Sequence, residues 1–201
     1  MPQLLVKAKE FKGEILQTPP MYSAVQINGK RLYELARKGI EVERPKRKVT
    51  IHSIEILDFD ESAQSGTLRA VCSRGTYIRT LISDIAVSLS TVGVMTSLCR
   101  ERSGGFSLEK ALTLDEIQKL KEDGKLNEAV IPPDRAFYCY ESIALDQKLT
   151  RLYKNGVILR ASQVKKPLTE TARVYGFDGE FLGLCRFNES QDKVYQFKNF
   201  Y

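Results

Sequence analysis

The sequence predicts an α+β fold, in which a mixed or largely antiparallel sheet with flanking helices is followed by a small β-rich C-terminal domain. Strand-like and helix-like segments alternate along the chain, but the strands are joined too tightly for regular βαβ units. At residues 121–134 the chain turns polar and ends in two prolines, as domain boundaries often do. We therefore expect one domain over residues 1–132 and a second over residues 133–201.

The first clear element is a tight turn followed by a helix. Residues 22–27 alternate in polarity and lead into the Asn28-Gly29 pair, which favours a two-residue hairpin turn. The next residues, 31–38, predict a helix that Gly39 closes. Apolar periodicity predicts the other elements of this domain, which are strands at 48–59, 66–73 and 94–101 and helices at 77–89 and 113–121.

The C-terminal part predicts a short helix and three strands. The helix is expected near residues 145–154. The strands are expected at 172–177, 181–187 and 194–200, with an Asp178-Gly179 turn after the first and a polar turn at 188–192 after the second. A domain of this size is marginally stable alone, so we expect it to pack on the first domain or on a ligand.

The composition excludes several classes of protein. Of the 201 residues, 42% are apolar and 28% are charged, as in soluble globular proteins, and no run approaches the roughly 20 apolar residues that cross a bilayer. Residues 1–16 contain no secretory signal, so a cytoplasmic location is expected. The four cysteines lie far apart and His52 is the only histidine. We therefore predict no metal site and four free, buried thiols.

Positive charge is concentrated in one stretch of the chain. Residues 30–48 contain eight basic and three acidic side chains, which accounts for most of the net charge of +6. Such a cluster is either a solvated surface or a track for the phosphates of a nucleic acid. The six residues that we assign to this track are Lys30, Arg31, Arg44, Lys46, Arg47 and Lys48.

Two longer motifs flank this basic stretch. One is QTPPMYSAVQINGKRLYELARKG at residues 17–39, and the other is CSRGTYIRTLISD at residues 72–84. They resemble the tyrosine motif and the arginine motif of the bacterial tRNA pseudouridine-55 synthases, the TruB family. The resemblance implies the pseudouridine synthase fold in part, a PUA-like RNA-binding domain at the C-terminus, and a monomer that binds the T-arm stem-loop of tRNA with no metal or organic cofactor.

The resemblance also implies roles for individual residues. Pseudouridine formation requires a uridine to leave its stack and enter a pocket. Tyr22 would stack on the flipped base and assist proton removal from C5, and Arg79 would keep a catalytic aspartate ionised. Tyr77 and Leu98 would line the pocket. Each side chain also has an ordinary structural explanation, in which the tyrosines and the leucine pack in a core and the arginine pairs with a neighbour.

The family's nucleophilic aspartate has no counterpart in this sequence. In the family it lies in a G-T-L-D-P segment before the tyrosine motif, whereas the first aspartate here is Asp58. Thr113-Leu114-Asp115-Glu116 shares three letters with that segment, but Thr113 and Glu116 have the spacing of a helix capping box. We therefore expect a fragment of a synthase that is inactive alone.

Two alternatives remain open. One is a noncatalytic RNA-binding module derived from a pseudouridine synthase, which has kept the RNA-binding surface and lost the chemistry. The other is the related archaeal and eukaryotic synthase that works with a guide RNA, although the compact C-terminal domain favours the stand-alone bacterial type.

Overall fold

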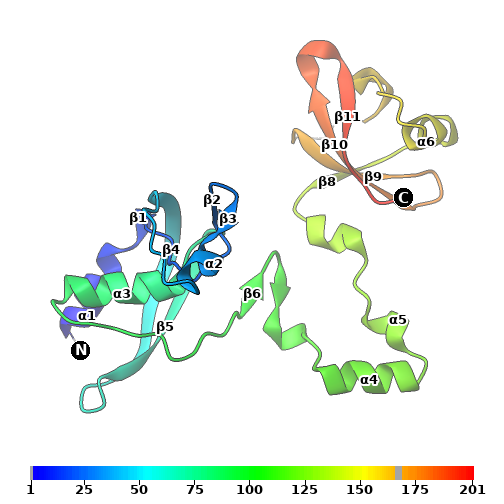
Figure 1. Cartoon of the computed structure of the whole chain (residues 1–201). Coiled ribbons are helices and arrows are strands. Elements are labelled where there is room, and N and C mark those ends of the chain that lie inside the picture. The colour runs from blue at the N-terminus through cyan, green and yellow to red at the C-terminus, as the bar shows by residue number, and fades with distance from the viewer. Residues whose placement is uncertain (1, 166–168) are drawn as a thin grey trace. The chain divides into compact units, whose positions relative to one another are not determined.

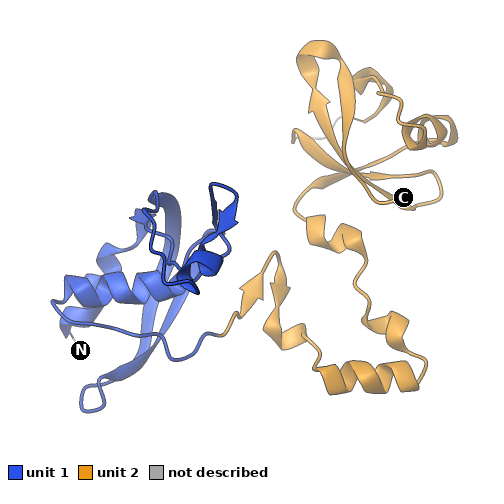
Figure 2. Ribbon diagram, in the orientation of Figure 1, with its two compact units in different colours: residues 1–98 blue, residues 99–201 orange. Residues whose placement is uncertain are grey.

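The computed structural model describes residues 2–165 and 169–201, and the chain forms two compact units, residues 1–98 and 99–201 (Figure 2). The boundary predicted after residue 132 lies within the second unit. No residue between 99 and 142 is buried, and the buried core of the second unit begins at Ile143. The assignment of domains to residues 1–132 and 133–201 therefore stays a prediction, while the compact units divide at residue 98.

The first unit is built on a three-stranded antiparallel sheet in the order β1-β4-β5. The strands are β1 (Gly13–Gln17), β4 (Arg47–Asp60) and β5 (Ser65–Cys72), and the main helices are α1 (Pro2–Glu10) and α3 (Ile78–Ser88) (Figure 1). Ala8 of α1, Ile51 of β4 and Leu81 and Ile85 of α3 form the buried core. The predicted strand pair and amphipathic helix are confirmed.

A small hairpin and a short helix extend this unit. The elements are β2 (Gln26–Ile27), β3 (Lys30–Arg31) and α2 (Leu32–Ala36). Asn28 and Gly29 both have positive φ, 51° and 77°, as the predicted two-residue turn requires. Leu32 is fully buried, and Gly39, with φ 69°, follows the helix as predicted.

The second unit starts with short elements and ends with a four-stranded sheet in the order β11-β10-β9-β8. The short elements are β6 (Arg102–Ser103), β7 (Phe106–Ser107), η1 (Leu108–Lys110), α4 (Leu114–Glu122), α5 (Leu126–Ala129) and η2 (Pro133–Phe137). The sheet region comprises β8 (Glu141–Ala144), α6 (Gln147–Lys154), η3 (Ala161–Gln163), β9 (Thr171–Tyr175), β10 (Phe181–Asn188), η4 (Glu189–Gln191) and β11 (Lys193–Asn199).

The four-stranded sheet is mixed, because β8 pairs parallel to β9 while the other pairs are antiparallel. Its main core includes Ile143, Leu149 and Tyr153, and α6 supplies the last two. A second apolar cluster is aromatic: Phe137 of η2 stacks on Phe181, with ring centroids 6.2 Å apart. The predicted helix and three strands of the C-terminal part are confirmed, and the predictions omitted β8.

Three expectations about local structure have clear outcomes. Residues 94–101 form no strand, because no strand of the described residues pairs with them, although the Glu101 carbonyl accepts a hydrogen bond from the Leu108 N–H at 2.8 Å. The capping box is present: the Thr113 hydroxyl accepts a bond from the Glu116 N–H at 3.3 Å, and Glu116 accepts one from the Thr113 N–H at 2.7 Å. All four cysteines are free as predicted, but the expectation of burial holds only for Cys185, because Cys72 is half-buried and Cys99 and Cys139 are exposed.

The described residues contain neither a membrane-spanning helix nor a cluster of metal ligands. No helix among them is both long enough and apolar enough to cross a bilayer. No group of three or more histidine, cysteine, aspartate or glutamate side chains in residues 2–165 and 169–201 is arranged to hold a metal ion.

Candidate active-site surface

The two motifs are joined by one buried side chain, that of Gln17. Gln17 is 1% exposed and lies at the end of β1. Its Nε2 donates a hydrogen bond to the carbonyl oxygen of Tyr77 at 3.2 Å, and its Oε1 accepts one from the Tyr77 N–H at 3.0 Å. The N–H and the carbonyl of Tyr77 are therefore both held by one side chain that lies 60 positions earlier in the sequence. This pairing places the start of the tyrosine motif beside the start of α3.

The arm that follows Gln17 presents Tyr22 to solvent. Pro19 is fully buried and Ser23 is 7% exposed, whereas Tyr22 between them is 61% exposed. The backbone beyond Tyr22 is also fixed, because the Ser23 carbonyl accepts a hydrogen bond from the Tyr33 N–H at 3.1 Å. An exposed aromatic ring on a backbone held at both sides suits stacking on a nucleobase, because little conformational entropy remains to be lost.

Arg79 lies in the first turn of α3 and is exposed. Tyr77, the N-cap residue of this helix, has extended backbone angles and is half-buried, and no side chain caps the helix. No ion pair of Arg79 is found among the residues that the structure describes. A cation near a helix N-terminus is slightly disfavoured by the helix dipole, so this guanidinium is available to an anionic group.

Leu98 is 58% exposed and lies in a segment without regular secondary structure, at the end of the first unit. Leu98 is therefore not part of the buried core of the first unit, and its place in the base-binding pocket stays a prediction. Sequence reasoning missed Gln17, although this residue is the first letter of the tyrosine motif. No pattern within the motif indicates that its partner is the backbone of Tyr77.

The basic track divides into paired and unpaired side chains. Lys48 forms an ion pair with Glu14 across β4 and β1, at 2.8 Å, and this contact raises the pKa of Lys48. Arg31 donates to the Tyr33 hydroxyl at 3.1 Å. The side chains of Lys30, Lys46 and Arg47 are exposed and form no hydrogen bond or ion pair within residues 2–165 and 169–201. These three are the ones most available to phosphates.

Lys46 also connects the track electrostatically to the arginine motif. Burial raises the pKa of Asp84 in α3, and the positive charge of Lys46 opposes that shift. The Asp84 carboxylate is thus close enough to sense Lys46. The Lys46 end of the track therefore lies near α3 in the first unit.

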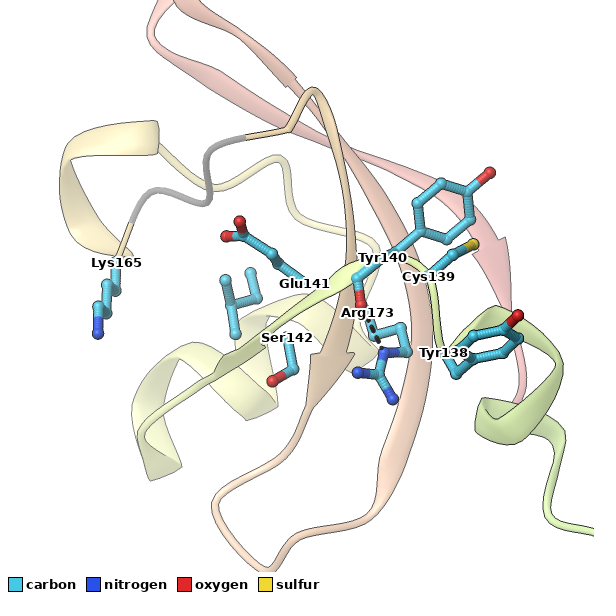
Figure 3. Close-up of a pocket in the computed structure, with 8 residues that line it drawn as sticks. Tyr138, Cys139, Tyr140, Glu141, Ser142, Lys165 and Arg173 are labelled. Atoms are coloured by element: carbon cyan, nitrogen blue, oxygen red, sulfur yellow. Dashed lines mark hydrogen bonds between the residues drawn. The ribbon is translucent and has the colours of Figure 1, made fainter.

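A separate hollow lies in the second unit, at the edge of its sheet formed by β8 (Figure 3). It has a volume of about 430 Å³, and basic and aromatic side chains contribute to its lining, among them Tyr138, Lys165 and Arg173. Arg173 is oriented by two hydrogen bonds, from Nε to the Tyr140 carbonyl at 2.9 Å and from Nη1 to the Tyr175 hydroxyl at 3.2 Å. Ser142 pairs with Arg173 in the β8-β9 register, so both side chains lie on one face.

Comparison with family models gives two adjacent matches. Residues 3–78 match the model described as TruB family pseudouridylate synthase (N terminal domain). Residues 79–138 match the model described as tRNA pseudouridylate synthase B C-terminal domain. Together they cover the tyrosine motif, the arginine motif and the basic track.

Curated relatives and solved structures agree with these matches. The tRNA pseudouridine synthase B of Levilactobacillus brevis is 37% identical over 98% of this chain and 67% of its own length. That of Clostridium tetani is 43% identical over 92% of this chain and 62% of its own length. A chain in the crystal structure of a Cbf5-Nop10-Gar1 complex matches the whole chain with a TM-score of 0.77 and 24% identity, over 62% of its own length. The chain thus spans about two thirds of the length of these proteins.

Proposed function

Because the chain belongs to the TruB family of pseudouridylate synthases, we propose that it provides the base-binding and RNA-binding part of a tRNA pseudouridine-55 synthase. The reaction isomerises a uridine of the tRNA T-arm: the N1 glycosidic bond breaks, the base turns, and C5 bonds to the ribose with loss of the C5 proton. The observation that carries this proposal is the Gln17–Tyr77 pairing, which joins the two family motifs on one surface.

The side chains on this surface have distinct roles in the proposed reaction. Tyr22 stacks on the flipped uracil and assists removal of the C5 proton, and Tyr77 lines the same pocket. Arg79 holds a nucleophilic carboxylate in its ionised form, because an adjacent guanidinium favours the charged state. Lys30, Lys46 and Arg47 contact phosphates of the stem-loop. The covalent step belongs to the carboxylate, so these residues position the base and stabilise charge.

The second unit is proposed to add a further RNA contact. The hollow at the β8 edge combines an exposed tyrosine ring with the cations of Arg173 and Lys165, a combination that suits a base and its phosphate. This contact would be the PUA-like function expected for residues 133–201. We propose that the chain acts on RNA as a monomer.

A second candidate function is a noncatalytic RNA-binding module. The 201 residues contain no aspartate before Asp58 and span about two thirds of the relatives' length, so a synthase fragment and a noncatalytic module make the same prediction for this chain by itself. The same fact predicts that the 201-residue chain binds a T-arm stem-loop but does not isomerise its uridine.

The test is tritium release from a T-arm stem-loop labelled at C5 of uridine, with binding of the same RNA measured in parallel. RNA binding without tritium release fits both candidate functions. A polypeptide that carries the family's G-T-L-D-P segment is then added: tritium release in the mixture supports the synthase, and its absence supports the noncatalytic module. Turnover by the chain alone would show that another of its carboxylates is the nucleophile. Absence of RNA binding would overturn both candidates.

A further inference from the structure

We propose that Arg44 is a positioning residue for Tyr22 and makes no contact with RNA phosphates. This inference rests on the proposed function of Tyr22 as the base-stacking residue. Arg44 was assigned to the basic track because of its charge and its place in the sequence. The contacts of its side chain indicate a different role.

The guanidinium of Arg44 points into the protein. Its Nη1 donates a hydrogen bond to the carbonyl oxygen of Pro19 at 3.3 Å, and its Nη2 pairs with the carboxylate of Glu41 at 2.9 Å. Its Nε is buried, and the side chain as a whole is only 21% exposed. An approaching phosphate would therefore meet a cation that is already paired, with one donor shielded from solvent.

The acceptor of this bond controls the base-stacking arm. Pro19 has no backbone N–H to donate, so its carbonyl oxygen is the only backbone group through which a hydrogen bond can fix it. Gln17 fixes the chain two residues before Pro19, and the Ser23 carbonyl is fixed four residues after it. Arg44 supplies the anchor between these points, three residues before Tyr22.

The basic loop and the arm are thereby connected. Arg44 lies between Glu41 and the exposed pair Lys46 and Arg47, in the segment between α2 and β4. When Lys46 and Arg47 bind phosphates, they order the loop that carries Arg44, and Arg44 in turn holds the arm. Phosphate binding and base stacking are therefore predicted to be coupled through one guanidinium.

Charge-conserving substitution separates the two roles. Arg44→Lys keeps the positive charge, but an ammonium lacks the planar fork that reaches both Pro19 and Glu41. A phosphate ligand at this position would tolerate the change. A positioning residue would not, and loss of a charge-assisted hydrogen bond predicts a decrease in affinity for the flipped base of roughly tenfold.

The arm can be observed without catalysis, because the chain contains no tryptophan. Tyr22→Trp introduces a single tryptophan in the arm, and its indole can be excited apart from the eight remaining tyrosines. In this background we expect Arg44→Lys and Glu41→Gln to increase the quenching of the indole by base-stacking nucleosides and by acrylamide and to lower its anisotropy, in the absence of RNA. Arg151→Lys is the matched control, because Arg151 is an exposed arginine of α6 outside the basic track, and it should leave both signals unchanged.

RNA binding by the same variants gives the second readout. If Arg44 contacts phosphate, Glu41→Gln frees its charge and strengthens binding, and Arg44→Lys preserves it. If Arg44 positions the arm, both substitutions weaken stacking of a 2-aminopurine base at the target site, while the salt dependence of binding stays the same. Unchanged indole mobility in both variants would overturn the inference. If indole mobility changes but the parent chain binds no RNA, the proposed function is wrong and the anchoring role of Arg44 still holds.

Discussion

The side-chain amide of Gln17 binds both the N–H and the carbonyl of Tyr77, so a residue at the end of β1 determines where α3 begins. Gln17 Oε1 thereby satisfies the N–H of Tyr77, the N-cap residue of α3, while no side chain caps the N–H groups of the first turn. The pairing also brings together two motifs separated by the whole of β4 and β5. The arrangement of Tyr22 and Arg79 therefore depends on an uncharged residue that performs no chemistry itself.

Replacing Gln17 should destabilise the first unit selectively. Gln17→Ala leaves the Tyr77 N–H without its acceptor, which costs about 1–3 kcal/mol for a partly buried group, and the Tyr77 carbonyl keeps only its bond from the Leu81 N–H. The measurement is hydrogen exchange of the α3 amides, which reports on this unit alone. Gln3→Ala, an exposed change in α1, is the control. Equal protection in both variants would mean that water replaces the Gln17 amide without cost.

The basic track predicts the salt dependence of RNA binding. Lys46→Ala with Arg47→Ala removes the cations most available to phosphate, and each lost contact should lower the slope of log affinity against log salt by about 0.7–0.9. Lys48→Ala should have less effect, because Glu14 already neutralises Lys48. The control is the double change Lys119→Ala and Lys121→Ala in α4, with the same loss of charge. An unchanged slope in the first variant would identify the track as a solvated surface.

The β8 hollow gives a prediction for the second unit. Tyr138 is 63% exposed, so Tyr138→Ala should weaken binding of a single-stranded oligonucleotide with little effect on folding. We expect about 1–3 kcal/mol per stacked base, measured by fluorescence anisotropy. Phe197→Ala is the matched control, because Phe197 is also exposed but stacks with Arg186 on a different part of the sheet. If an acidic peptide binds there and the oligonucleotide does not, the hollow is a protein-binding site.

The cysteines predict different reactivity within one chain. Burial raises the pKa of the Cys185 thiol to about 12, so this thiol stays protonated and unreactive at pH 8. Cys99 and Cys139 are exposed and should react with iodoacetamide first, as peptide mass spectrometry would detect. Because the pKa of Cys185 is higher in the folded state, its contribution to stability is complete below pH 9 and is lost as the pH rises from about 9 to about 12. Rapid labelling of Cys185 in the folded chain would contradict this prediction.

Local sequence signals predicted most of the elements, and contacts distant in sequence account for what they missed. The Asn28-Gly29 turn, the capping box at Thr113 and the periodicity of α3 each depend on a few neighbouring residues. No strand forms at 94–101, because apolar alternation predicts a strand without indicating whether a partner strand is available to pair with it. The contacts that local signals missed join residues 25 to 60 positions apart in the sequence. They are the parallel pairing of β8 with β9, the bonds of Gln17 to Tyr77 and the bond of Arg44 to Pro19. Motif spacing gave the candidate site residues, which stay predictions, and only the structure identified Gln17 and Arg44 as residues that hold these segments.

The role of Arg79 can be tested by restoring a carboxylate. The relatives in this family are about half as long again as the chain, and a separate polypeptide that carries the family's G-T-L-D-P segment should complete the pocket. Arg79 is exposed and unpaired among the described residues, and a guanidinium beside a carboxylate lowers the pKa of that carboxylate. We therefore expect the mixture to release tritium from C5-labelled stem-loop RNA.

In the same mixture, Arg79→Ala should abolish release while RNA binding persists, because the basic track is unchanged and only the orientation and ionisation of the aspartate are lost. Arg151→Ala, an exposed arginine of α6, should support release at the parental level. Raising the pH should rescue part of the Arg79→Ala activity if ionisation is the main defect, because a carboxylate whose pKa has risen is deprotonated again at higher pH. Full activity of Arg79→Ala at every pH would make Arg79 a structural arginine, and the assignment of this surface as the active site would fail with it.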